Sequence, residues 1–288
     1  MSRPLRRFAT AALFVACMSL LAGCGSFVSN FAQDLTNATL KHPDPATIQD
    51  ALPTFLLILE ARLESDPNDE ALLLATAKMY TGYNLWFVAG NDQRRAKILA
   101  DRAKDYAVRG FSQDHDEFAA LHDKPYQEFD KLRGTFDEDD VADLDTVVGA
   151  WASWVITHAD QSDAIADLAK LRLLSEELLR LNPEYNYGSP HLYLGMILTV
   201  VPPGMNAEFE KGREHFEEAV RLSDGVSFPA YVAYAQRYAK TVFDRELHDQ
   251  LLQYVVRMRT DVVPELTLIN TLAQRQAEQL LAEADDYF

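Results

Sequence analysis

The sequence predicts an all-α protein, and three observations support that prediction. From Asp44 onward the apolar residues recur at steps of three and four positions, the spacing that places them on one face of a helix. No stretch keeps a period of two for long, so strands are not expected. Proline also recurs at the turns between helical stripes, at 65–68 and 181–184, where it prevents the first helix from continuing.

The individual elements follow from these stripes and turns. Pro264 stands in the favoured first turn of the last stripe, and the segment 112–139 is expected to be a long loop with one short helix. Residues 25–44 are expected to form a tether or a loosely packed first helix. The expected helices are 46–65, 69–89, 92–110, 140–157, 162–181, 190–200, 207–222, 228–241, 244–258 and 264–286.

Two consecutive helix pairs share one layout. An offset of 41 residues relates Leu181 to Leu222 and Tyr193 to Tyr234. This period exceeds the roughly 34 residues of a regular tetratricopeptide repeat (TPR). We therefore predict that residues 45–288 form a degenerate TPR-like α-solenoid of stacked antiparallel helix pairs.

The N-terminus has the pattern of a secretory signal. Three arginines precede an apolar run, 8–21, that is too short for a transmembrane helix and has no stop-transfer charges after it. The run ends in Leu21-Ala22-Gly23-Cys24, which resembles a bacterial lipobox. We expect a lipoprotein signal peptide over 1–23, a lipidated Cys24 and a tether over 24–44. The alternative is a soluble-secretory peptide that contains this cysteine by accident.

Lipidation would attach the protein firmly, because two or more acyl chains are needed for stable anchoring and such a cysteine carries three. By resemblance to proteobacterial lipoproteins, Gly25 after the cysteine favours the outer membrane over the inner one. Cys17 would leave with the signal, so the mature domain would have no free thiol, disulfide or thiolate metal site.

The charge excludes one class of partner. The whole chain has a formal net charge of −17, and without the signal 24 basic residues remain against 44 acidic ones. Nucleic-acid binding needs a positive surface, so no nucleic-acid partner is expected. The 48% of hydrophobic residues also excludes intrinsic disorder.

Motifs for chemistry are missing from the sequence. It contains no His-Glu-x-x-His, no Gly-x-Ser-x-Gly, no phosphate-binding loop and no Gly-x-Gly-x-x-Gly. The cluster 114–117 is typical of a solvated polar loop, and the acids at 137–140 lack the glycine and glutamate that a calcium loop requires. We expect no catalytic residue, no metal and no cofactor.

Aromatic residues recur at helical spacing on three predicted helices. Such stripes are usually core between stacked helices, but tyrosine and tryptophan also suit an apolar cleft on the inner helices of a solenoid. The candidate cleft or ligand-binding residues are Tyr80, Tyr83, Trp86, Trp151, Trp154, Tyr193, Tyr231, Tyr234 and Tyr238.

Positive charge gathers on one predicted helix, 94–109, which has a net charge of +4. It is either an outer face that pairs with acids such as those at 137–145, or a docking patch for an acidic partner. The candidate docking residues are Arg94, Arg95, Arg102 and Arg109.

The chain ends with acids where a helix dipole disfavours them, at Asp285 and Asp286. They must lie beyond the helix in solvent or pair with cations. We expect an arginine of a neighbouring helix, or of another subunit, to hold them.

Several segments in family order carry a resemblance to the T-component family of TRAP transporters, TatT. They include 72–83, 95–97, 102–109, Ala150-Trp151 with Trp154, 191–195, Pro202-Pro203, 216–219, 228–235 and the closing 270–288. The resemblance covers about residue 45 to the end, together with the lipoprotein signal. One departure is Met205-Asn206-Ala207, which stands where a Gly-Gly-Asp-like turn is expected.

The resemblance implies a periplasmic, membrane-tethered α-solenoid that is not an enzyme. It implies a partner, the periplasmic solute-binding subunit of a TRAP transporter, and assembly as a homotrimer with a hydrophobic cleft or pore for a small-molecule solute. One alternative is a TPR-like scaffold lipoprotein of outer-membrane or envelope assembly. A lipid-anchored envelope hydrolase is disfavoured because no nucleophile or metal motif is found.

Overall fold

The computed structural model describes residues 34–200 and 208–288. The predicted signal peptide, Cys24, the first part of the tether and the departure at 205–207 lie outside these ranges. Residues 34–40 are helical, and Thr39–Phe288 form one compact unit. Within the described residues, no helix is both long enough and apolar enough to cross a membrane.

The all-α prediction is confirmed, since the described residues contain helices and turns but no strand. The α-helices are α2 (Pro45–Leu63), α3 (Glu70–Tyr83), α4 (Gln93–Phe111), α5 (Asp116–Leu121), α6 (Tyr126–Phe129), α7 (Val141–Thr157), α8 (Ser162–Leu181), α9 (Tyr185–Leu198), α10 (Phe209–Leu222), α11 (Pro229–Ala233), α12 (Arg245–Arg257) and α13 (Thr267–Ala282). Two π-helical segments, η1 (Asn84–Val88) and η4 (Tyr234–Ala239), continue α3 and α11. The 3₁₀ turns are η2 (Asp130–Leu132), η3 (Glu138–Asp140), η5 (Pro264–Leu266) and η6 (Ala284–Asp286).

Aspartate caps explain why several helices begin within a residue or two of the predicted positions. A side-chain carboxylate at the N-cap accepts hydrogen bonds from backbone N–H groups that lack a partner inside the helix. Four helices use this device, with caps at Asp44, Asp69, Asp92 and Asp244. In α2 the cap is reinforced by Pro45, whose fixed φ suits the first turn.

Two expectations need correction. The segment 112–139 contains two short helices and two 3₁₀ turns, because Phe118, Phe129 and Leu132 are fully buried and pin it to the core. The helix expected at 190–200 has an earlier beginning in α9, but Asn186, Tyr187 and Gly188 have positive φ. The regular run therefore begins only after that kink.

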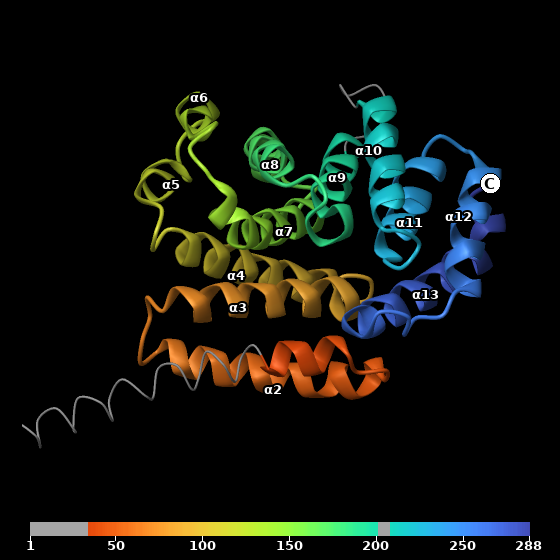
Figure 1. Cartoon of the computed structure of the whole chain (residues 1–288), viewed down its shortest axis with the longest axis horizontal. Helices are drawn as coiled ribbons and strands as arrows, with labels where there is room; N and C mark the ends of the chain where they lie inside the picture. The colour runs from red at the N-terminus through yellow and green to blue at the C-terminus, as the bar shows by residue number, and fades with distance from the viewer. Residues whose placement is uncertain (1–33, 201–207) are drawn as a thin grey trace, which may run out of the picture. The chain divides into compact units, whose positions relative to one another are not determined.

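The helices pack as stacked pairs, which makes the fold α-solenoid-like (Figure 1). Each first helix contacts both helices of the pair before it: α7 packs on α3 and α4, α9 on α7 and α8, and α11 on α9 and α10. In the same way α13 packs on α11 and on α12.

The last helix also returns to the first one. Helix α13 contacts α2, and Lys41 beside α2 forms an ion pair with Glu265 before α13, at 3.0 Å. Arg245 of α12 binds Asp285 at 2.6 Å, so the expectation that a neighbouring helix holds the terminal acids is confirmed for Asp285. The C-terminal end is further anchored by Tyr287, whose hydroxyl lies 2.9 Å from Nε2 of the buried His248.

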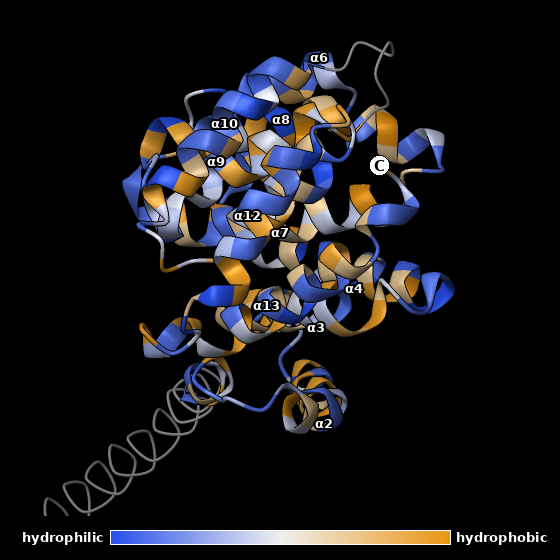
Figure 2. Ribbon diagram, turned by 90° about the vertical axis from the view of Figure 1, so that its right-hand side faces the viewer, coloured by the Kyte–Doolittle hydropathy of each residue, from blue (hydrophilic) through white to orange (hydrophobic). Residues whose placement is uncertain are grey.

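The core has two clusters of buried apolar residues. One gathers residues from α2 to α9 together with α13, and the other gathers residues from α10 to α13. Trp86 of η1 packs against both clusters. Most helices contain both hydrophobic and hydrophilic residues, as expected for helices that bury one face and expose the other (Figure 2).

Helices α9 and α10 approach each other closely at a glycine. A Cβ atom on Gly195 would lie 2.8 Å from ring carbons of Phe216, which is fully buried and has no room to move. The absent side chain of Gly195 is therefore what lets the phenylalanine ring lie flat against α9.

We expect Gly195→Ala to lower the free energy of unfolding by about 1–3 kcal/mol, because overpacking at the Phe216 ring outweighs the gain in helix propensity. The matched control is Gly82→Ala in α3, where nothing lies within 4 Å of the added Cβ. That control should gain about 0.5–1 kcal/mol. Urea unfolding followed by circular dichroism measures both, and a stabilised Gly195→Ala would contradict the packing described.

Candidate functional site

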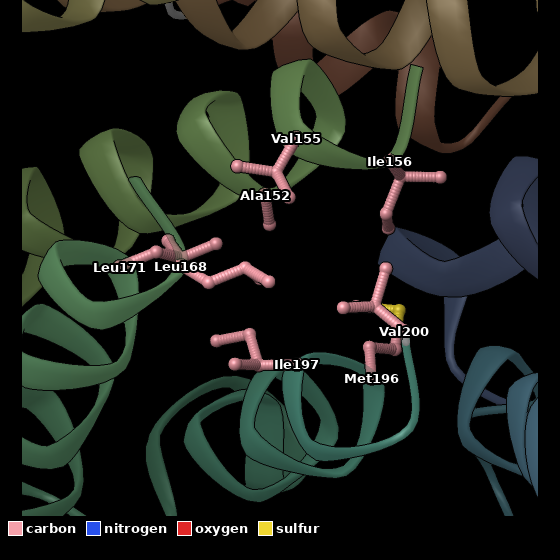
Figure 3. A pocket seen from close by; sticks show the side chains of 8 residues that line it. All are labelled: Ala152, Val155, Ile156, Leu168, Leu171, Met196, Ile197 and Val200. Carbon is pink, nitrogen blue, oxygen red and sulfur yellow. The ribbon is translucent and has the colours of Figure 1, made fainter. Parts of the chain in front are cut away.

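An apolar pocket lies between α7, α8 and α9 (Figure 3). It contains about 190 Å³ of empty volume. The side chains in Figure 3 surround a common space, and no charged group is among them. The lining residues are Ala152, Val155, Ile156, Leu168, Leu171, Met196, Ile197 and Val200.

The pocket occupies one end of a parallel contact between α7 and α9. At the other end of this contact, Ser189 of α9 donates a hydrogen bond to Asp145 of α7 at 2.8 Å. Burial raises the pKa of Asp145, and burial and the nearby Asp145 raise the pKa of Tyr193. Polar groups are therefore paired at the N-terminal end, and the C-terminal end is left to apolar side chains.

The chemistry of the pocket follows from its lining. With no charged group and almost no polar surface, it can receive an apolar group but cannot orient a polar one. Part of its empty volume is open to solvent, so the enclosed space is far smaller than the about 300–1,000 Å³ of pockets for drug-sized ligands. It contains no nucleophile, acid or base for a reaction.

The aromatic candidates on α3 belong to the contacts of α3 with α2 and α4. Tyr80 donates a hydrogen bond to Glu60 at 2.7 Å and stacks on Tyr106, and burial raises its pKa to about 12. The hydroxyl of Tyr83 accepts a hydrogen bond from Arg95 at 2.9 Å. Both tyrosines are buried, whereas Trp86 is half-buried.

The tryptophans of α7 form an aromatic cluster around a lysine of α4. Lys104 Nζ lies 3.6 Å from the ring centre of Trp154 and 4.4 Å from that of Trp151, and it forms an ion pair with Asp167 at 2.7 Å. Burial lowers the pKa of Lys104. Trp151 is 2% exposed, so its ring belongs to the interior.

The tyrosines of α11 and η4 are buried in the second core cluster. Tyr234 and Tyr238 donate hydrogen bonds to Glu217 and Glu210 of α10, at 3.2 and 3.1 Å. Tyr231 stacks on a tyrosine of α12. The aromatic candidates thus lie in several separate helix contacts and not around the pocket, although Tyr193 and the pocket share the contact between α7 and α9.

The pocket residues carry no signal in the sequence that separates them from other core positions. They belong to ordinary helical stripes, and only the packing of three helices leaves space between them. The sequence also gives no signal for the burial of Asn84 in η1. This side chain is fully buried, and among the described residues its amide has no hydrogen-bond partner.

The basic helix α4 pairs with acids other than those expected. Lys97 binds Asp160 at 2.8 Å, and Arg102 binds Glu60. Helix α7 runs antiparallel to α4, which places residues 137–145 at the far end of α4, where Asp140 binds His115 at 2.8 Å. The acids at 137–145 therefore lie out of reach of the basic side chains nearer the start of α4.

The four candidate docking arginines differ in their contacts. Arg95 and Arg102 contact tyrosines of α3, and Arg109 binds Asp105 at 3.2 Å and the carbonyl oxygen of Pro67 at 2.9 Å. Arg94 is exposed and has no ion pair within the described ranges. It alone of the four has its whole charge available to a partner.

No group of three potential metal ligands occurs in the described part of the chain. The nearest arrangement is a histidine pair between α9 and α10, His191 and His215, whose Nδ1 atoms lie 3.0 Å apart. Burial lowers the pKa of both imidazoles, and this favours a neutral pair in which one ring donates a hydrogen bond to the other.

The fold and the pocket together define an α-solenoid-like protein with a small apolar pocket between three of its helices. Residues 41–288 match the family described as TRAP transporter T-component, so the chain belongs to that family. It is also similar to an uncharacterized protein of Treponema pallidum (strain Nichols). The two are 23% identical over 272 residues, which cover 88% of this chain and 84% of that protein.

We expect Leu171→Ala to enlarge the pocket and to cost about 2–5 kcal/mol, because Leu171 is 1% exposed and its removal leaves a cavity. Ile165→Ala on the same helix is the matched control, since Ile165 is 41% exposed and should cost less than about 1 kcal/mol. Benzene should raise the melting temperature of Leu171→Ala more than that of the wild type, because it can fill the apolar cavity. An equal response of the two proteins would show that the pocket does not accept an apolar group.

Proposed function

We propose that this protein is a non-enzymatic, lipid-anchored periplasmic component of a TRAP-type transport system that binds the solute-binding subunit. Membership of the T-component family is the single observation that carries this proposal. The stacked pairs support a degenerate TPR-like architecture, in which the first helices line a concave surface suited to a partner. Tethering such a surface to the membrane raises the local concentration of the soluble subunit.

The apolar pocket supports a second part of the proposal, that the protein accepts part of a hydrophobic solute. Its lining favours an apolar group. We propose further that the protein assembles as a homotrimer and that the cleft or a pore between subunits extends the binding surface. The aromatic candidates retain a role in shaping this surface through the helix contacts that they stabilise.

The anchor is proposed on the sequence of the lipobox at 21–24. Mass spectrometry of the purified protein should find a chain that begins at Cys24 and carries three acyl groups. Cys24→Ser should remain unacylated and leave the membrane fraction on cell fractionation. Gly25 places the anchor at the outer membrane more readily than at the inner one, and recovery in the inner-membrane fraction would contradict that placement.

Docking is proposed to begin at Arg94, the exposed arginine of the basic helix. Co-purification from envelope extracts should recover a solute-binding subunit of a TRAP transporter. Arg94→Glu should slow the association of that subunit several-fold at low ionic strength and much less at high salt, since rim charges act mainly on the association rate. Surface plasmon resonance measures both rates.

The matched control is Arg275→Glu on α13, which removes an equally exposed positive charge from another helix. It should leave the association rate within about twofold, because Arg275 lies on α13 and not on the proposed docking helix α4. Recovery of outer-membrane assembly factors in place of the solute-binding subunit would support the scaffold alternative and contradict the proposal.

A further inference from the structure

The outer face of α2 differs in charge from the outer face of a later helix, α10. The exposed residues of α10 are all charged, as is typical of a helix face in water: Glu210, Lys211, Glu214, Glu217 and Arg221. The exposed residues of α2 are Ala46, Thr47, Gln49, Asp50, Thr54, Leu57, Ile58 and Ala61. Only Asp50 among them is charged, so water meets an almost uncharged face on α2.

Two large apolar side chains lie next to each other on this outer face. Leu57 is 66% exposed and Ile58 is 52% exposed, and Thr54 and Ala61 flank them at the spacing of one helical turn. Glu60 is turned toward α3 and α4, where it binds a tyrosine and an arginine. Single exposed apolar residues are common on proteins, but an adjacent pair on an uncharged face is a candidate contact surface.

The position of α2 in the array makes this face unusual. Helix α2 is the first full helix of the compact unit, and its opposite face contributes Ile48, Leu52 and Leu56 to the first core cluster. Figure 1 shows α2 at one edge of this unit, with α3 packed between α2 and α7. The end helices of a repeat array normally need a polar outer face to remain soluble. An end helix with an apolar outer face is therefore expected to be covered by another surface.

The chain length before α2 keeps this face close to the proposed lipid anchor. Cys24 stands 15 residues before Thr39, where the compact unit begins, and that length spans at most about 50 Å. Leu57 lies roughly 18 Å along the helix from Pro45, the first residue of α2. A short tether holds a surface at a local concentration on the order of millimolar, so even a weak contact with the bilayer becomes populated.

The charge of the molecule favours a lipid surface as the occupant of this face. The chain has a formal net charge of −17, and an anionic membrane repels acidic surfaces. The outer face of α2 meets little of this repulsion, since Asp50 is its one charged residue. The interfacial region of a bilayer also accepts the apolar side chains of a helix that lies in its plane. An uncharged face offers no charge complementarity to a protein partner, in contrast to the basic helix α4.

We propose that the outer face of α2, centred on Leu57 and Ile58, docks on the surface of the membrane that holds the lipid anchor. The anchor attaches the protein, and the docked face fixes the orientation of the helical array. The apolar pocket of α7, α8 and α9 then lies beyond α3 from the bilayer. This inference rests on the proposed anchor and adds a second membrane contact, which the anchor alone does not supply.

The test uses the full-length acylated protein in vesicles of phosphatidylethanolamine and phosphatidylglycerol, at less than one protein molecule per vesicle. Acylation blocks Cys24 and Cys17 leaves with the signal, so the cysteine of Ile58→Cys is the only free thiol. It is labelled with an NBD fluorophore, whose emission shifts to the blue in apolar surroundings. The matched control is Ile165→Cys on α8, because Ile165 is 41% exposed. Lipids with a doxyl group on the acyl chain should quench the label at 58 at least threefold more strongly than the label at 165.

A second substitution in the labelled Ile58→Cys protein tests the neighbouring side chain. Leu57→Gln should reduce the quenching at least twofold, because it removes apolar contact with the bilayer, whereas Ile165→Gln should leave the quenching unchanged. Leu57→Gln should also leave the melting temperature within about 2 °C, since Leu57 is exposed and its loss creates no cavity.

Equal quenching of the labels at 58 and 165 would overturn the proposal, as would quenching that Leu57→Gln does not change. A blue shift at 58 that requires several protein copies per vesicle would assign the face to a second copy. One that requires the solute-binding subunit would assign it to that protein, and both results contradict lipid docking. Mass spectrometry of the same sample separates the two proposals: a missing acyl group contradicts the anchor, whereas an acylated Cys24 with an unquenched label contradicts the docking alone.

Discussion

The structure depends on one packing constraint: the first helix of each pair must lie against both helices of the pair before it. Helix α9 shows why, since it contacts α7 and α8 of the preceding pair as well as its own pair partner α10. No single pair covers its apolar surface, so stability comes from neighbouring pairs. The contact of α13 with α2 matters for the same reason, because it covers apolar residues at both ends of the described array.

The same constraint explains what the sequence could and could not predict. Helical periodicity and aspartate caps depend on local spacing, so α2, α4, α8 and α12 begin and end close to their predicted positions. The kink at 186–188 and the two π-helical segments depend on tertiary packing and have no comparable local signal. The burial of residues 118, 129 and 132 depends on contacts with distant parts of the sequence. Local spacing does not show such contacts, so this segment was expected to be a loop.

For the candidate site the limit of prediction is chemical. Tyrosine and tryptophan were sensible candidates because they offer an apolar face with a polar end. In the structure those polar ends are occupied: Tyr80 by Glu60, Trp151 by Asp167 and Tyr234 by Glu217. The pocket is instead formed by aliphatic side chains, which leave space wherever three helices meet imperfectly. The types of residue in the sequence therefore cannot show whether the space between three packed helices is filled or leaves a pocket.

The arrangement of charge on α4 limits which of its cations a partner could meet. Most cations of α4 are neutralised by acids or contact tyrosine rings, so the net positive charge of that segment overstates what a partner meets. Arg94 is exposed and can meet the surface of a macromolecule, where water and salt weaken its attraction.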